Sequence, residues 1–79
     1  MKVRIDIMLK NGVLDPQGKA ISHALGNLGF EKVEDVRVGK TIILTTSETD
    51  EAKAIAAAKS MSEKILANMV IEDFVVTIL

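Results

Sequence analysis

The only histidine of the sequence, His23, is the first residue whose side chain could do chemistry. A general base needs an orienting partner within hydrogen-bond reach and a pocket around it. No carboxylate stands at helical spacing from His23, which lies at the edge of an apolar stripe that includes Ala20. We therefore predict a partly exposed helix histidine. A stand-alone enzyme that uses His23 with a carboxylate ranks last among the functional hypotheses.

Two pairs of adjacent acids, Glu34-Asp35 and Glu72-Asp73, are the next candidates. Adjacent strand residues point to opposite faces of a sheet, so neither pair makes a ready carboxylate dyad. Glu72 and Asp73 stand near the start of a predicted strand. Contact with the cations of a partner and simple solvation are two interpretations that the sequence leaves open for them.

Arg37, Gly39 and Lys40 are residue types found in phosphate sites, but their context favours a turn. A phosphate-binding loop needs a longer glycine-rich run that leads into a helix. Here a single glycine precedes Lys40 and the chain continues into a predicted strand. We predict a tight turn at Gly39 and Lys40. We expect no catalytic, cofactor-binding or metal-binding residue in this chain.

The spacing of apolar residues predicts the elements that position these side chains. Residues 2–10 alternate strictly between apolar and polar, which indicates a half-buried strand. A helix is predicted to begin with Asp15 as N-cap and Pro16 as its first residue, and to stop at Gly29. The apolar stripe of this helix contains Ala20, Ile21, Ala24, Leu25 and Leu28.

Residues 31–38 and 41–46 are predicted to be a second and a third strand, joined as a hairpin. A second helix is predicted to follow a cap at Ser47 or Thr49 and to end at Asn68. Its inner stripe contains Ala54, Ile55, Ala58, Met61, Ser62, Ile65 and Leu66. The last predicted strand spans residues 70–78, with Phe74, Val76 and Ile78 on one face.

The resulting order, βαββαβ, predicts one α+β domain over residues 1–79 with a ferredoxin-like fold. Right-handed crossovers would place both helices on one face of a four-stranded antiparallel sheet. The helix-free face would then carry Met8, Ile43 and Val75 among charged residues. Such a mixed face favours burial against a second subunit, and an ordinary exposed face is the alternative.

Composition excludes several classes of protein. The chain has ten basic and eleven acidic residues, and two phenylalanines are its only aromatic residues apart from His23, which argues against a nucleic-acid partner. No apolar run approaches the roughly 20 residues that span a bilayer. There is no cysteine, so disulfides and thiolate metal sites are excluded. A cytoplasmic protein is the expectation.

Three segments resemble one family when they are read together. They are residues 14–18 (LDPQG), residues 35–40 (DVRVGK), and residues 66–68 with 70–74 (LAN and VIEDF). In this order and spacing they resemble the PurS family, the small subunit of phosphoribosylformylglycinamidine synthase. The sequence departs from the family pattern at Ile43, Ser62, Met69 and Phe74.

The resemblance implies a function that the residues alone do not reveal. It implies a non-catalytic subunit of a purine-pathway ligase complex that uses ATP, Mg and glutamine. This subunit would bridge an ATP-dependent synthetase (PurL) and a glutaminase (PurQ), and would itself form a dimer or a tetramer. Ammonia must pass between two active sites, and a bridging subunit can align them.

Partner contacts are expected where the matching segments lie. Ten residues are the candidates: Asp15, Gln17, Gly18, Asp35, Arg37, Gly39, Lys40, Asn68, Glu72 and Asp73. Gly18 is of special interest because a glycine in the first turn of a helix permits close approach of a backbone, here hypothesised to be that of another chain. The alternative function is a ferredoxin-like regulatory module that binds a small ligand at a dimer interface.

Overall fold

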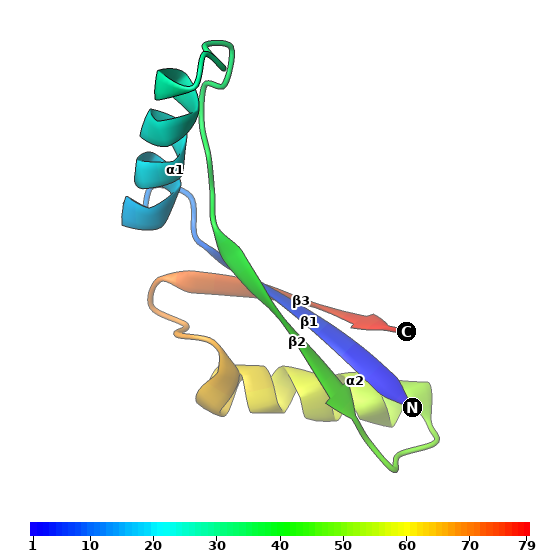
Figure 1. The fold of residues 1–79 in the computed structure, drawn as a ribbon. Coiled ribbons are helices and arrows are strands. Elements are labelled where there is room, and N and C mark those ends of the chain that lie inside the picture. Colours follow the sequence, from blue (N-terminus) through cyan, green and yellow to red (C-terminus); the bar gives the residue numbers. More distant parts are fainter.

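The computed structural model describes residues 1–79 and contains three strands, two α-helices and one π-helical turn (Figure 1). In chain order the elements are β1 (Lys2–Leu9), α1 (Pro16–Asn27), β2 (Gly39–Thr45), α2 (Glu51–Met61), the π-helical turn η1 (Ser62–Leu66) and β3 (Glu72–Ile78). The predicted α+β class is confirmed. None of the helices combines the length and hydrophobicity that crossing a bilayer requires.

The sheet is antiparallel with β1 at its centre, in the order β2-β1-β3. Ile5 of β1 lies opposite Ile42 of β2 and Val76 of β3. The alternation predicted for β1 is confirmed, because Val3, Ile5 and Ile7 are at most 1% exposed. These three side chains form the centre of the core on one face of the sheet.

Helix α2 covers that face, where it contacts β1 and β3. Ala54 and Ala58 are its buried residues, and their small side chains let the helix lie close to the sheet. The predicted caps at Ser47 and Thr49 are wrong, since Asp50 is the N-cap and accepts a hydrogen bond from the Lys53 amide at 3.1 Å. Asp can accept this bond as well as Ser or Thr can, so spacing alone did not separate the candidates.

The predicted end of the second helix is also corrected. A π-helical turn carries the chain to Leu66, and the buried Ser62 hydroxyl donates to the Ala58 carbonyl at 2.8 Å. Asn68 instead opens the turn into β3, where its carbonyl accepts from the amides of Ile71 and Glu72. Its backbone is not left-handed, because only glycines have positive φ in this chain.

Helix α1 stands away from the sheet, which corrects the expectation of two helices on one face. It projects from one end of the sheet together with the segment that returns from it to β2 (Figure 1). We call residues 16–38 the arm, and the strands with α2 and η1 the body. The arm gives the molecule principal extents of 48 × 25 × 14 Å and a radius of gyration of 15.9 Å. A compact domain of this length has a radius of gyration of about 12 Å.

The sheet has three strands and not four, because residues 31–38 form no strand. The amide of Val38 donates to Asp15 and not to a neighbouring strand, and the carbonyl of Val36 lies in close contact with Gly18. The expected hairpin is therefore absent. Gly39 and Lys40 are the first residues of β2, not a turn, and β2 pairs with β1.

The helix-free face of the sheet is as predicted. Met8, Ile43 and Val75 are each more than two-fifths exposed on it. Arg4 and Asp6 lie between them and form an ion pair with 3.1 Å between Nε and Oδ2. Asp6 also accepts from the Thr41 hydroxyl at 2.7 Å. This face therefore presents apolar side chains around a small hydrogen-bonded centre.

Candidate partner-binding site

The arm meets the body at a junction that is built around Asp15. This residue follows the loop after β1 and is the N-cap of α1, as predicted, with Pro16 as the first helical residue. Its Oδ1 accepts from the Gly18 amide at 2.8 Å, and its Oδ2 accepts from the Val38 amide at 2.8 Å. One carboxylate therefore caps α1 and also ties the helix start to the entry of β2.

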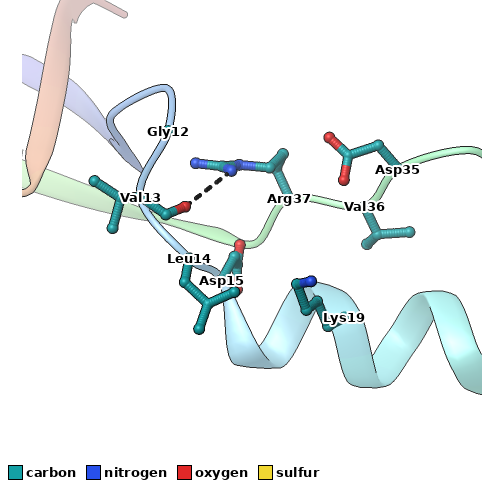
Figure 2. A pocket seen from close by; sticks show the side chains of 8 residues that line it. All are labelled: Gly12, Val13, Leu14, Asp15, Lys19, Asp35, Val36 and Arg37. Carbon is teal, nitrogen blue, oxygen red and sulfur yellow. Dashed lines mark hydrogen bonds between the residues drawn. The ribbon is translucent and has the colours of Figure 1, made fainter.

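Arg37 makes the second set of bonds at the junction. Its Nη1 donates to the Val13 carbonyl at 3.2 Å, a contact drawn in Figure 2. Its Nη2 donates to the carbonyls of Lys10 at 3.0 Å and Leu9 at 3.3 Å. The planar guanidinium thus joins the segment that returns from α1 to the end of β1 and the loop that follows it.

Gly18 is the third component. A Cβ at this position would overlap the Val36 carbonyl and lie 3.1 Å from the Asp15 Cγ, so only glycine fits without movement. The close approach that the sequence suggested at Gly18 is therefore made by the same chain. Whether another chain also touches Gly18 stays a prediction.

The electrostatics of the junction favour an ionised Asp15. Its side chain is 6% exposed, and the hydrogen bonds from Val38 and then Gly18 hold the pKa of its carboxyl below its ordinary range. Removal from water opposes this shift of the pKa, and the Arg37 charge supports it. A carboxylate with backbone donors on both oxygens and a guanidinium nearby is a rigid anchor, not a poised acid or base.

Two cavities adjoin the junction and share Asp15. One, of about 260 Å³, is lined by residues that include Lys19, Asp35 and Arg37 (Figure 2). The other, of about 310 Å³, is lined by residues that include Gln17, Lys40 and Glu72. Seven of the ten predicted contact residues line these cavities: Asp15, Gln17, Asp35, Arg37, Gly39, Lys40 and Glu72. Three segments that are distant in sequence therefore meet at one end of the sheet.

The remaining candidates lie beside this cluster. Gly18 is buried beneath it. The Asn68 amide donates to Glu72 Oε1 at 2.7 Å, which holds the turn before β3. Asp73 is exposed on β3 opposite Met8. The ten residues are thus gathered around one region of the molecule.

His23 lies on the exposed side of α1, in line with the sequence interpretation. The fold brings Glu34 and Asp35 to the same open cavity as His23, because residues 34–38 run back beside the helix. Helical spacing could not reveal this proximity. His23 makes no hydrogen bond to either carboxylate, and no three acidic or histidine side chains are grouped to hold a metal ion.

One exposed surface was missed by sequence reasoning. Ile65 is 80% exposed and Val70 is 83% exposed, at η1 and at the turn that follows it. Ile65 was predicted to point inward, but the π-helical turn adds a residue per turn and rotates it away from the sheet. Met69 and Ile71 beside it are also more than one-third exposed. No local pattern signals a π-helical turn, so only the fold reveals this apolar surface.

Comparison with known proteins assigns the chain to a family. The family model for PurS, described as phosphoribosylformylglycinamidine (FGAM) synthase, matches residues 2–79. The PurS subunit of this synthase from Bacillus subtilis is 47% identical over 73 residues, which cover 92% of this chain and 86% of that protein. The PurS subunit from Methanocaldococcus jannaschii is 40% identical over 92% of this chain and 88% of its own length.

Solved structures agree with this assignment. A crystal structure of PurS from Bacillus subtilis matches 96% of this chain and 94% of its own with a TM-score of 0.84 and 45% identity. A chain in the structure of PurLQS from Thermotoga maritima matches 99% of this chain and 95% of its own, with a TM-score of 0.88 and 32% identity. The arm, the junction and the three-stranded sheet thus occur in a chain that belongs to the PurS family of phosphoribosylformylglycinamidine synthase subunits.

Proposed function

We propose that this chain is the non-catalytic bridging subunit of a phosphoribosylformylglycinamidine synthase in purine biosynthesis. It would hold a PurL-type synthetase and a PurQ-type glutaminase together, so that ammonia released from glutamine reaches the formylglycinamide ribonucleotide. Membership of the PurS family supports this proposal, as does the similarity to a chain of PurLQS from Thermotoga maritima.

The observation that carries the proposal is the small share of the chain that is buried. Eight of the 79 residues are buried, and five of them form the hydrophobic core. Large apolar side chains are exposed on the arm, on the open sheet face and around η1. So much apolar surface is typical of a chain that is covered by other proteins.

Self-association is part of the proposal. On the arm, Ile21, Leu28 and Phe30 are 44%, 73% and 58% exposed, although helical spacing gives α1 a clear apolar stripe. A second copy of the chain would cover such surfaces symmetrically, as a dimer or as a tetramer. The larger partners would then contact the assembly and not an isolated chain.

ATP and Mg²⁺ would be used by the synthetase subunit, and this chain would supply no ligand to them. Its own contribution would be positional, through residues of the junction and its surroundings. The proposed location is the cytoplasm, where the substrates of such a complex are made and used.

Reconstitution tests the proposal directly. The synthetase and glutaminase subunits are assayed with glutamine as nitrogen source, with and without this chain. We expect glutamine-dependent product formation only when the chain is present. Ammonium chloride in place of glutamine is the control, since it removes the need for transfer between subunits. Equal glutamine-dependent rates with and without the chain would reject the proposal.

A size measurement tests self-association. Sedimentation of the purified chain should give the mass of a dimer or a tetramer at micromolar concentration. A species of 8.5 kDa at all concentrations would contradict this part of the proposal.

A further inference from the structure

We propose that Asp15 and Arg37 are positioning residues that fix the angle between the arm and the body, and thereby set the rate of glutamine-dependent amidation. This inference rests on the proposed bridging function. It goes beyond it by naming the side chains that give the bridge its shape.

Little else in the chain holds the arm. Helix α1 makes no extended contact with the sheet or with α2, and it projects beyond the end of the sheet (Figure 1). Leu25 is the only half-buried residue of its apolar stripe. The direction of the arm therefore depends on bonds at its base, not on packing along its length.

Those bonds converge on two side chains. Asp15 joins the amide of Gly18 in α1 to the amide of Val38 at the entry of β2. Arg37 joins the returning segment to the carbonyls of Leu9, Lys10 and Val13. Asp15 thus holds the two ends of the arm together where the chain enters it, and Arg37 holds the returning end against the end of β1 and the loop that follows. Charge-assisted hydrogen bonds of this kind are the stronger ones in proteins.

Because the arm is long, a small rotation at its base causes a large displacement at its tip. Twelve residues of α1 at about 1.5 Å per residue span roughly 18 Å, so a tilt of about 10° at the base moves the tip by about 3 Å. Misplacement of reacting groups by about 1 Å can reduce a rate by about 100-fold. A small change at the junction should therefore disturb the alignment of two partners without unfolding the chain, because the core residues Val3, Ile5 and Ile7 lie elsewhere.

The variant Asp15→Asn distinguishes the role of Asp15 in positioning the arm from its role as the N-cap of α1. Asn caps helices as well as Asp does, so Asp15→Asn should keep the bond from the Gly18 amide. Its amide nitrogen cannot accept the bond from the Val38 amide, which is thereby lost. Asp50→Asn is the matched control, because Asp50 caps α2 through one oxygen and receives no bond across the junction.

Lysine at position 37 provides the second variant. Arg37→Lys keeps the positive charge but cannot donate to three carbonyls in the fixed geometry of a guanidinium. Lys53→Arg is its control, since it exchanges the same two side-chain types at an exposed position of α2, where only the Lys53 backbone amide makes a hydrogen bond.

The first readout is the rate of the reconstituted complex with each nitrogen source. We expect Asp15→Asn and Arg37→Lys to lower glutamine-dependent turnover by about tenfold or more, while ammonium-dependent turnover stays within about twofold of wild type. Both controls should leave both rates unchanged. A variant that is merely unstable would instead lose activity in parallel with its melting temperature.

The second readout needs no partner. The natural chain has no cysteine, so Asn27→Cys on the arm and Lys59→Cys on α2 can be labelled cleanly with nitroxides. In oligomers diluted with unlabelled chain, the wild-type background should give one narrow distance distribution. Asp15→Asn or Arg37→Lys should broaden it, and Asp50→Asn should not.

Each result bears on the inference. An unchanged distance distribution in both junction variants overturns it. So does a broadened distribution with wild-type glutamine-dependent turnover, and so does a complex that fails to assemble, since that would make these residues necessary for association. If the wild-type chain proves dispensable for turnover, the bridging function fails; the link to turnover then fails with it, and the distance measurement separately decides whether the two residues fix the arm.

Discussion

The body and the arm of this chain use apolar residues in opposite ways. In the body, Val3, Ile5 and Ile7 are almost fully buried beneath α2. In the arm, an equally regular apolar stripe on α1 remains largely exposed, and the only buried residue is Gly18, next to the N-cap Asp15. The difference shows that the spacing of apolar residues specifies which face of an element is apolar. It does not specify whether that face is buried by the same chain or by another chain.

The two regions are also held by different forces. The body is stabilised by burial of aliphatic surface, which is non-directional and scales with area. The arm is held by directed bonds from Asp15 and Arg37 at its base. Directed bonds fix an angle better than they add stability, which suits a projecting element that has to meet partners in one orientation.

The largest effect should come from a cavity in the body. Ile5→Ala removes a side chain that is 0% exposed and should lower the free energy of unfolding by about 2–5 kcal/mol. The total free energy of unfolding of so small a domain is about 4–12 kcal/mol. Urea denaturation at one fixed chain concentration measures the change. Ile43→Ala, at a 49% exposed site on the opposite face, should cost about 1 kcal/mol or less. Equal losses would contradict the assignment of the core.

The next largest change in stability is expected at Gly18, and Gly26 of the same helix provides the comparison. Gly18→Ala should destabilise the junction by about 1–3 kcal/mol, because the new methyl group overlaps the Val36 carbonyl. Gly26→Ala meets open space and should stabilise α1 by up to about 1 kcal/mol. Thermal unfolding of both variants checks the opposite signs. A gain of stability in Gly18→Ala would mean that the arm and the returning segment are not in close contact.

A third effect is the pH dependence of the junction. Because folding lowers the pKa of Asp15 below its ordinary value of 3.8, the carboxylate stabilises the folded chain fully above that value. This contribution is lost as the pH falls through the lowered pKa. An NMR titration of the side-chain carboxyl should therefore give a midpoint for Asp15 below 3.8. A midpoint at or above the ordinary value would show that the two backbone bonds do not persist in solution.

The smallest effect on folding is expected at the exposed apolar surface of η1 and the following turn. Ile65→Ser and Val70→Ser alter side chains that are 80% and 83% exposed, so the free energy of unfolding should change by about 0.5 kcal/mol or less. Binding to the larger subunits should weaken if this surface is part of the bridge. Lys64→Ser in the same turn is the control. Unchanged binding in both apolar variants would remove this surface from the proposed interface.

Local rules predicted several elements correctly. The N-cap at Asp15 with Pro16 after it, the inward alternation of β1, and the face of β3 that carries Phe74 and Val76 are all confirmed. Each depends on residues that are close in sequence, where capping, fixed φ or side-chain period decides the outcome. The family could also be named from three short segments, and the comparisons confirm it.

Errors arose where distant segments compete for the same backbone groups. Residues 31–38 have a pattern that permits a strand, yet the Val38 amide donates to Asp15 and the Val36 carbonyl lies against Gly18, so neither pairs with a neighbouring strand. The inward prediction for Ile65 failed because a π-helical turn changed the helical phase after Met61. Neither the contacts of residues 31–38 with the start of α1 nor the π-helical turn can be recognised from the spacing of residues in the sequence. Strand and helix propensities alone therefore could not predict either feature.

The sequence by itself determined the elements that depend on near neighbours, the apolar faces and the family of this chain. Only the tertiary structure decided that α1 stands away from the sheet, and that Asp15, Gly18 and Arg37 form one junction. The physical reason is the separation of the interacting residues along the sequence. Helix caps and apolar periodicity depend on residues that are only a few positions apart. The bonds from Arg37 to Leu9 and from Val38 to Asp15 form only after more than twenty intervening residues have folded back.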